Sequence, residues 1–466
     1  MFESKIYIER RKKLKELMKT GLIFFPGNSE SPINYTDNTY HFRQDSDFLY
    51  YFGLDEPNLA AIIDVDKNNE IIFGNDLTIS DIIWTGPAPS IAEKAELVGI
   101  KKTMPLKKLT STLQNAKKKK QKIHFLPQYR AANKIWMEEL IGIKATKTNE
   151  KASEKLIKAV VSQREIKSSE EVEQMEIAVD ISYEMNLAAM KHSQPGLLEQ
   201  EIFGLVEGIA LSMGSGVSFP IIFSIHPETL HNHYHGNIMK KGDILVLDSG
   251  AESPLHYASD ITRTFPVSGK FSNLQKDLYQ IIYKANTTVI NMMKPGVANR
   301  DCHFTAVKII AQGLKDLGYM KGDIDEAVKA GAHALFMPHG LGHQIGLDVH
   351  DMEGLGEDYV GYDAKYKRSK QFGTAYLRMG KEFKPGHVMT VEPGLYFIPE
   401  LIDQWKAEKK YANFINYSKV SKDVGVGGFR IEDDVLVTET GSRVLGKHIP
   451  KTVEEVEKAC KRGLFW

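Results

Sequence analysis

The feature that most constrains this chain is a set of acidic residues embedded in apolar, strand-like segments. Asp248 ends the run DILVLD, Asp260 opens DITRTFPV, Glu392 follows VMTV and Glu432 lies in GFRIEDDVLVT. Carboxylates that are buried without partners repel one another and are costly to remove from water. A fold that brings these segments together in its interior therefore needs a countercharge, and metal cations would supply one.

The first two acids are expected on a β-hairpin. The branched residues of DITRTFPV favour a strand, and Gly250, Ser253 and Pro254 between the two segments favour a turn. Such a hairpin would place Asp248 and Asp260 beside one another on adjacent strands. The other two acids also lie in strand-like sequence, so we expect three or four strand-borne carboxylates to converge on one concave face.

One histidine completes a plausible ligand set. His343 ends the glycine-rich segment PHGLGH, where the absence of side chains would let the backbone pass close to bound ions. Carboxylates with a single imidazole and no thiolate suit Mn²⁺ or a similar divalent ion. Four carboxylates would also balance the charge of two such ions. The pattern therefore indicates two divalent metal ions with a bridging hydroxide as the nucleophile.

Taken singly, each of these residues has a plainer explanation. An aspartate at the end of a strand usually serves a turn, and Glu432 is followed by two further acids, as in a solvated acidic stretch. A lone histidine is more often a hydrogen-bonded structural residue than a ligand. His231, His233 and His235 alternate, which fits a partly exposed polar strand better than a metal site.

The chain divides near residue 155. Before it, the apolar runs GLIFFPG, FLYYFGL, LAAIIDV and NEIIFGN are bounded by turn-forming residues and predict strands that alternate with helices, as in an α/β domain. After it, residues 155–190 predict two helices joined at a short turn, with Ser168 at the start of the second. Further helices are expected after Pro195 and at about 271–293 and 299–317, interspersed with strands.

Composition excludes several classes of partner. Lys plus Arg and Asp plus Glu each number 60, and this zero net charge gives no indication of a nucleic-acid or membrane partner. No apolar run approaches the roughly 18 residues that span a bilayer, and the charged N-terminus does not read as a signal peptide. Cys302 and Cys460 are widely separated, as in a reducing compartment. We therefore expect a cytoplasmic protein.

These segments, in this order, resemble the pita-bread metallopeptidases, in particular the branch that contains aminopeptidase P and prolidase. In the catalytic half the resemblance rests on QREIKSSEEVEQM, SFPIIFSIHPETLHNHYHGN, LVLDSGAESPLHYASDITRTFPVSGKF, MPHGLGHQIGLDVHD, MTVEPGLYF and GFRIEDDVLVT. It covers nearly the whole chain. It implies an α/β, aminopeptidase P-like N-terminal domain over 1–155 and an α+β pita-bread catalytic domain over 156–466.

The resemblance also implies a role for each matching residue. Asp248 would bind one ion, Asp260 and Glu432 would bridge two, and His343 and Glu392 would complete the second. Glu392 would also act as a proton shuttle.

Further residues match positions around the substrate. His233 and His350 would be the catalytic histidines that line the pocket, and the latter would orient the substrate or stabilise the oxyanion. The matches for substrate binding are His339, Arg430, Tyr396 and Trp84. Trp84 resembles a residue contributed by a neighbouring subunit, which implies a homodimer or homotetramer.

The resemblance leaves the length of the substrate open. FRQDSDFLYYFGLDEPN resembles aminopeptidase P, whereas the segment between Glu392 and Glu432, YFIPELIDQWKAEKKYANFINYSKV, is more similar to prolidase. We expect aminopeptidase P activity on proline-containing peptides, with an Xaa-Pro dipeptidase as the alternative. A metal-free hydrolase such as creatinase and a non-catalytic pita-bread binding protein are further alternatives, although both would be expected to lack part of the ligand set.

Overall fold

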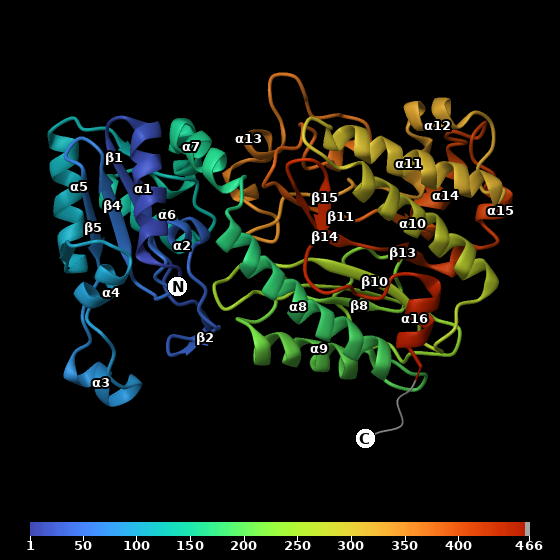
Figure 1. Cartoon of the computed structure of the whole chain (residues 1–466), viewed down its shortest axis with the longest axis horizontal. Helices are drawn as coiled ribbons and strands as arrows, with labels where there is room; N and C mark the ends of the chain where they lie inside the picture. Colours follow the sequence, from blue (N-terminus) through green and yellow to red (C-terminus); the bar gives the residue numbers. More distant parts are fainter. Residues whose placement is uncertain (462–466) are drawn as a thin grey trace. The chain divides into compact units, whose positions relative to one another are not determined.

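The computed structural model describes residues 1–461, which form two compact units (Figure 1). The first comprises Met1–Arg164 with Met352–Tyr359, and the second comprises Glu165–Asp351 with the residues from Val360 onward. Helix α7 (Glu154–Arg164) belongs to the first unit, and the boundary expected from the sequence falls within the first turn of this helix.

A five-stranded mixed sheet forms the centre of the first unit. Its strand order is β6-β5-β4-β1-β7, with antiparallel pairs in the middle and a parallel strand at each edge. The strands are β1 (Leu22–Pro26), β4 (Ala60–Asp64), β5 (Asn69–Phe73), β6 (Thr103–Met104) and β7 (Ile123–His124), and a separate pair consists of β2 (Pro32–Tyr35) and β3 (Asn38–Thr39). The helices are α1 (Ser4–Met18), α2 (Ser46–Phe52), α3 (Ile79–Thr85), α4 (Ile91–Leu97), α5 (Leu109–Lys118), α6 (Ala131–Ile141) and α7.

One expected strand of this unit is wrong. GLIFFPG, LAAIIDV and NEIIFGN supply β1, β4 and β5, but most of FLYYFGL lies in helix α2. The Asp45 carboxylate accepts a hydrogen bond from the Phe48 N–H at the start of α2, and Gly53 ends it in the left-handed conformation. Every residue of α2 is buried, so its sequence carries no periodicity that distinguishes a helix from a strand.

The second unit contains two three-stranded antiparallel sheets, with orders β10-β9-β8 and β11-β14-β15, and the two-stranded sheet β12-β13. The strands are β8 (Ile222–Ser224), β9 (Ile244–Ser249), β10 (Ile261–Pro266), β11 (Val388–Val391), β12 (Gly394–Tyr396), β13 (Gly428–Arg430), β14 (Asp433–Val437) and β15 (Ser442–Val444). The helices are α8 (Ser169–His192), α9 (Glu199–Met213), α10 (Asn273–Met292), α11 (Asn299–Asp316), α12 (Ile324–Ala330), α14 (Pro399–Ala407), α15 (Tyr417–Val420) and α16 (Val453–Ala459). Helix α13 (Glu357–Gly361) begins in the first unit and ends in the second.

The helices of the second unit follow the sequence closely. Ser168 caps α8 in a reciprocal capping box with Glu171, as its position predicts, and α10 and α11 occupy the expected ranges. Helices α8 and α9 pack against the β8–β10 sheet, and α10 contacts β11, β12 and β13 (Figure 1). The strands therefore lie between helical layers, and of the four acids Asp248, Asp260 and Glu432 are buried while Glu392 is half-buried. Among the described residues, no helix is long and apolar enough to cross a membrane.

The predicted hairpin is confirmed. Strands β9 and β10 pair antiparallel, with Asp248 opposite Thr262. A Cβ atom on Gly250 would lie 1.8 Å from the Ser259 carbonyl oxygen, so only glycine fits at this position of the turn. Of the four acids, however, only Asp248 lies within a strand, because Asp260 precedes β10 and the other two occupy breaks between consecutive strands.

Candidate metal centre

All five candidate ligands line one cavity of ≈ 380 Å³ in the second unit. Asp248 arrives on β9, Asp260 at the start of β10, and His343 on the glycine-rich loop. Glu392 lies between β11 and β12, and Glu432 between β13 and β14. The remaining lining residues are Phe219, Pro220, Ile222, Leu230, His231, His233, His339, Gly340, Gly342, Val349, His350, Tyr376, Arg378 and Arg430.

Three of the five form a tight group. One ligand atom from each of Asp260, His343 and Glu432 lies within 4.8 Å of the others, and all three residues are buried. His343 Nε2 is 3.4 Å from Asp260 Oδ2 and 3.8 Å from Glu392 Oε1. These separations let a single cation contact an oxygen and an imidazole nitrogen together.

The imidazole of His343 is held in the form that binds metals. Its Nδ1 lies 3.1 Å from the Gln344 carbonyl oxygen, which can only accept, so Nδ1 carries the proton. The lone pair on Nε2 then faces the carboxylates. Burial, together with the nearby His350, lowers the pKa of His343 well below its usual range and keeps the ring neutral.

A chain of hydrogen bonds through Arg430 and Thr262 orients Asp248 and Glu432. Arg430 Nη2 donates to Asp248 Oδ2 at 2.5 Å, and its Nη1 donates to the Tyr396 hydroxyl at 2.7 Å. Its Nε donates to Thr262 Oγ1 at 3.1 Å, and that hydroxyl donates to Glu432 Oε2 at 2.6 Å. One guanidinium therefore orients two of the acids, one directly and one through a hydroxyl.

The electrostatics of the group fit a cation. Burial and the charges of Glu432 and Asp248 raise the pKa of Asp260 well above its usual range, and burial and the charge of Glu392 do the same for Glu432. Burial raises the pKa of Glu392 to about 7. Asp248 Oδ1 and Asp260 Oδ1 are buried and have no hydrogen-bond partner in the described part of the chain. A divalent cation would satisfy these oxygens and favour the ionised carboxylates.

The glycines of the loop allow the backbone to pack closely against neighbouring segments. A Cβ atom on Gly342 would lie 2.0 Å from the Thr390 carbonyl oxygen, and one on Gly340 would lie 2.7 Å from the Leu377 Cα. The loop runs beside β11, where the Thr390 N–H donates to the His343 carbonyl oxygen and the His343 N–H donates to Thr390 Oγ1. Glycine therefore brings His343 next to Glu392 by close backbone contact.

The three alternating histidines do not form a strand. They lie in an irregular segment after β8, and only His231 and His233 line the cavity. The His235 ring hydrogen-bonds to the Phe223 carbonyl oxygen and stacks on Phe203, so it has a structural role.

The other residues singled out in the sequence have different surroundings. The ring of His350 lies 3.9 Å from that of His343, centroid to centroid, and both line the wall. Tyr396 is fully buried behind the wall, where its hydroxyl also lies 3.1 Å from His339 Nε2. Trp84 lies on α3 of the first unit and is 84% exposed.

Several residues at the site were not anticipated from the sequence. Thr262 carries the hydroxyl between two charged groups, and Arg378 lines the cavity. Asp433 and Asp434 are buried, not solvated as an acidic stretch would be, and Asp434 Oδ2 accepts the Asp260 N–H at 3.0 Å. The run of three acids in a β-rich segment could have indicated the role of Asp434. In an extended segment alternate side chains share a face, so Asp434 would lie on the same face as Glu432.

Comparison with family models decides the family. The model for metallopeptidase family M24 matches residues 173–439, more than half of the chain, and the model for the aminopeptidase P N-terminal domain matches residues 7–124.

The chain belongs to metallopeptidase family M24.

Relatives along the whole chain include members with two named activities. Xaa-Pro dipeptidase of Homo sapiens is 32% identical over 98% of this chain and 91% of its own length. A probable Xaa-Pro aminopeptidase of Fusarium vanettenii is 31% identical over 94% and 91%, respectively. Among solved structures, aminopeptidase PepP of Pseudomonas aeruginosa has a TM-score of 0.81 at 26% identity, and Escherichia coli aminopeptidase P with the inhibitor Pro-Leu has 0.80 at 27%, each covering 98% of both chains.

These findings confirm the resemblance, the fold class and the enzyme class expected from the sequence. The M24 match covers the α+β pita-bread catalytic region, and the N-terminal match covers most of the α/β region. Family M24 enzymes use divalent metals, and the Asp260, His343 and Glu432 group offers a site for one.

Proposed function

We propose that this M24 enzyme is an Xaa-Pro aminopeptidase that uses two divalent metal ions, most readily Mn²⁺, to remove an N-terminal residue that precedes proline. The observation that carries the proposal is the convergence of four acids and one neutral imidazole in one cavity. Aminopeptidase P structures similar to this chain along 98% of its length support the substrate class.

Four carboxylates and one imidazole offer more donor atoms than a single six-coordinate ion requires. We assign Asp248 to one ion, His343 and Glu392 to the other, and Asp260 and Glu432 to positions between them. The charge of four carboxylates equals that of two divalent ions, and oxygen donors with one imidazole suit Mn²⁺. When bound, the ions would supply Lewis acidity toward the peptide carbonyl and a water acidified for nucleophilic attack.

The residues around the donors prepare the cavity for a peptide bond. Arg430 holds the Asp248 carboxylate at 2.5 Å, and Tyr396 supports both Arg430 and His339 from behind the wall. His233 and His350 line the cavity, where their ring nitrogens would bind the substrate and donate to a developing oxyanion. In this scheme Glu392 moves a proton at its Oε atoms toward the leaving amine.

Proline has a matching surface in the cavity wall. An Xaa-Pro bond is a tertiary amide without an N–H, so a peptide cannot be recognised there through backbone donation. Phe219, Ile222 and Leu230 line the cavity beside the histidines and offer apolar contacts to the pyrrolidine ring. Shape and apolar contact therefore replace the missing hydrogen bond.

We further propose that Trp84 completes the pocket of a neighbouring subunit in a homodimer or homotetramer. Helix α3 has no buried residue, and Ile79, Ile83 and Trp84 are 75%, 74% and 84% exposed. Trp84→Ala should raise KM more than it lowers kcat. Wild-type kinetics in this variant would contradict the assignment, and size-exclusion chromatography would report the oligomeric state.

A second candidate function is Xaa-Pro dipeptidase activity. The positive charge of Arg378 in the cavity wall could pair with the C-terminal carboxylate of a dipeptide, and a dipeptidase relative is 32% identical over 98% of this chain. If the enzyme is an aminopeptidase, the substrate chain continues past proline and no C-terminal carboxylate lies next to Arg378.

One experiment separates these functions. The protein is stripped with a chelator, reloaded with Mn²⁺, and assayed on an Xaa-Pro dipeptide and on the same sequence extended by one and three residues. Aminopeptidase activity predicts Mn²⁺-dependent cleavage of the extended peptides. Exclusive cleavage of the dipeptide would favour the second function. Activity that survives chelation would indicate a metal-free hydrolase, and inactivity on every peptide would indicate a binding protein.

A further inference from the structure

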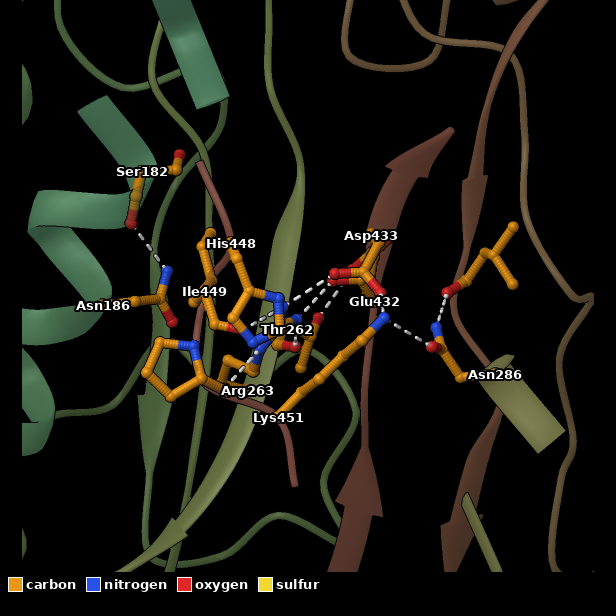
Figure 2. Close-up of polar contacts among 12 residues, drawn as sticks. Ser182, Asn186, Thr262, Arg263, Asn286, Glu432, Asp433, His448, Ile449 and Lys451 are labelled. Carbon is orange, nitrogen blue, oxygen red and sulfur yellow. Dashed lines mark hydrogen bonds and ion pairs between the residues drawn. The ribbon is translucent and has the colours of Figure 1, made fainter. Parts of the chain in front are cut away.

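A buried ion network lies behind the candidate metal centre, on the face of β14 opposite Glu432. Asp433 accepts from Arg263 Nη2 and from Lys451 Nζ, each at 2.7 Å, and the three side chains are 2%, 1% and 12% exposed (Figure 2). None of the three is among the residues that line the cavity. The network therefore does not contact a substrate in that cavity, and its role must be exerted through other residues.

Arg263 fixes the backbone of a ligand-bearing residue. Its Nη1 donates to the carbonyl oxygens of Glu432 at 2.6 Å and Thr262 at 2.9 Å. Its Nε donates to the Pro450 carbonyl oxygen, and Nη2 also reaches that of Ile449. All five N–H groups of the guanidinium are thus used. The segment of Ile449 and Pro450 is thereby joined to the backbone at Glu432.

Lys451 extends this connection to the residue that precedes a second candidate ligand. Its ammonium donates to Asp433 and also to Asn286 Oδ1 at 3.2 Å (Figure 2). Asn286 lies on α10, is fully buried, and donates through its Nδ2 to the Val391 carbonyl oxygen at 3.0 Å. Val391 immediately precedes Glu392. The two arms from Lys451 therefore end at residues adjacent to Glu432 and to Glu392.

The backbone of Lys451 is held from two helices. Its carbonyl oxygen accepts from the Tyr279 hydroxyl of α10 at 2.8 Å, and its N–H donates to Glu455 Oε2 of α16 at 3.1 Å. The position of the ammonium is therefore set by the packed core rather than by a mobile tail. Lys451 lies beyond residue 439, where the match to the M24 family model ends.

We propose that Lys451 is a positioning residue for the metal centre, which sets the spacing of Glu432 and Glu392 through Asp433 and Asn286. This rests on the proposed function, in which both glutamates bind metal. Loss of the ammonium would disconnect the two arms from each other, so this network would no longer fix the separation of the two carboxylates.

The test compares three variants with the wild-type protein. Lys451→Met removes the charge and donors at similar length, Lys451→Arg keeps a cation with donors, and Lys447→Met is a control in the same segment, where the lysine is 55% exposed. Each metal-stripped protein is titrated with Co²⁺. The visible absorption spectrum reports coordination, and competition with a chelator gives the dissociation constant.

We expect Lys451→Met to raise the Co²⁺ dissociation constant about tenfold and to alter the spectrum, because partners of metal ligands contribute about 10–100-fold and Lys451 acts through one more residue. Lys451→Arg should restore most of the affinity, and Lys447→Met should match the wild type. A Lys451→Met protein with a lower melting temperature but wild-type affinity and spectrum would overturn the proposal.

A second variant covers the case in which Lys451→Met does not fold. Asn286→Asp keeps the acceptor for Lys451 but replaces the donor to Val391 with an oxygen, so only the arm toward Glu392 is broken. It should also weaken Co²⁺ binding and change the spectrum, and unchanged binding would refute that arm. If the wild-type protein binds Co²⁺ but cleaves no Xaa-Pro peptide, the proposed function fails while these titrations still test Lys451.

Discussion

The hydroxyl of Thr262 offers a sharp test of the metal centre. It donates to Glu432 Oε2 at 2.6 Å, accepts from Arg430 Nε at 3.1 Å, and is fully buried. Valine has nearly the shape of threonine, so Thr262→Val removes both hydrogen bonds without opening a cavity. The substitution therefore isolates the effect of one oxygen atom on the orientation of Glu432.

The magnitude follows from the charge on both partners. A hydrogen bond to a charged group contributes about 1.5–3 kcal/mol. A tenfold change in affinity corresponds to about 1.4 kcal/mol, so losing the bond to Glu432 should weaken metal binding about 10–100-fold, the range typical of groups that orient ligands. The second hydrogen bond, from Arg430, is missing from the variant in both its metal-free and its metal-bound form. Its loss should therefore lower the stability of the metal-free protein and change metal affinity little.

The assay is a chelator competition that gives the Mn²⁺ dissociation constant, followed by thermal unfolding of the metal-free protein. Thr264→Val is the matched control, because Thr264 is also fully buried on β10 and, within residues 1–461, its hydroxyl exchanges hydrogen bonds only with the Arg430 N–H and carbonyl group. It should reduce stability while changing metal affinity much less. Wild-type Mn²⁺ affinity in Thr262→Val, or equal losses in both variants, would refute the reasoning.

Three further outcomes are expected. Chelation should lower the melting temperature and Mn²⁺ should restore it, with a difference that shrinks at acid pH, where protons compete for the carboxylates; scanning calorimetry across pH checks this. Asp434→Leu removes the acceptor for the Asp260 N–H and should weaken Mn²⁺ binding in calorimetric titration, whereas Asp434→Asn keeps an acceptor and should not. Burial alone would raise the pKa of Glu165, but Lys381 and Lys384 outweigh burial and bring the pKa to about 2. Ionised Glu165 therefore stabilises the fold above about pH 4.3, and this stabilisation is lost as the pH falls toward 2. Lys381→Met should therefore lower the free energy of unfolding in urea at neutral pH and flatten its decline over that acid range.

The elements that the sequence predicts well are those with a local cause. The β9–β10 hairpin follows from branched residues on either side of a turn, and α8 follows from the capping pair of Ser168 and Glu171. Helix α2 was missed because all its residues are buried, which removes the alternation that identifies a helix. Buried Asp434 resembled part of a solvated stretch because runs of consecutive acids are usually exposed.

The candidate ligands could be found by residue type, but their supporting residues could not. Carboxylates in apolar segments stand out, whereas Thr262 and Arg263 are ordinary residues of a strand until their partners are known. Those partners lie 170 and 169 positions away, at Glu432. No local pattern reports contacts at such separations, and Lys451 lies outside every segment that carries the family resemblance.

These separations have a consequence for how the protein is made. Asp248 and Arg430 are 182 positions apart, and a ribosome that adds about 5–20 residues per second needs about 9–36 s to synthesise that interval. Throughout this time the Arg430 guanidinium is not available to Asp248, and the two-ion site proposed for this protein would lack Glu432. Under that proposal, metal loading follows near-complete synthesis, so the cations present at that stage would decide which ones the protein acquires.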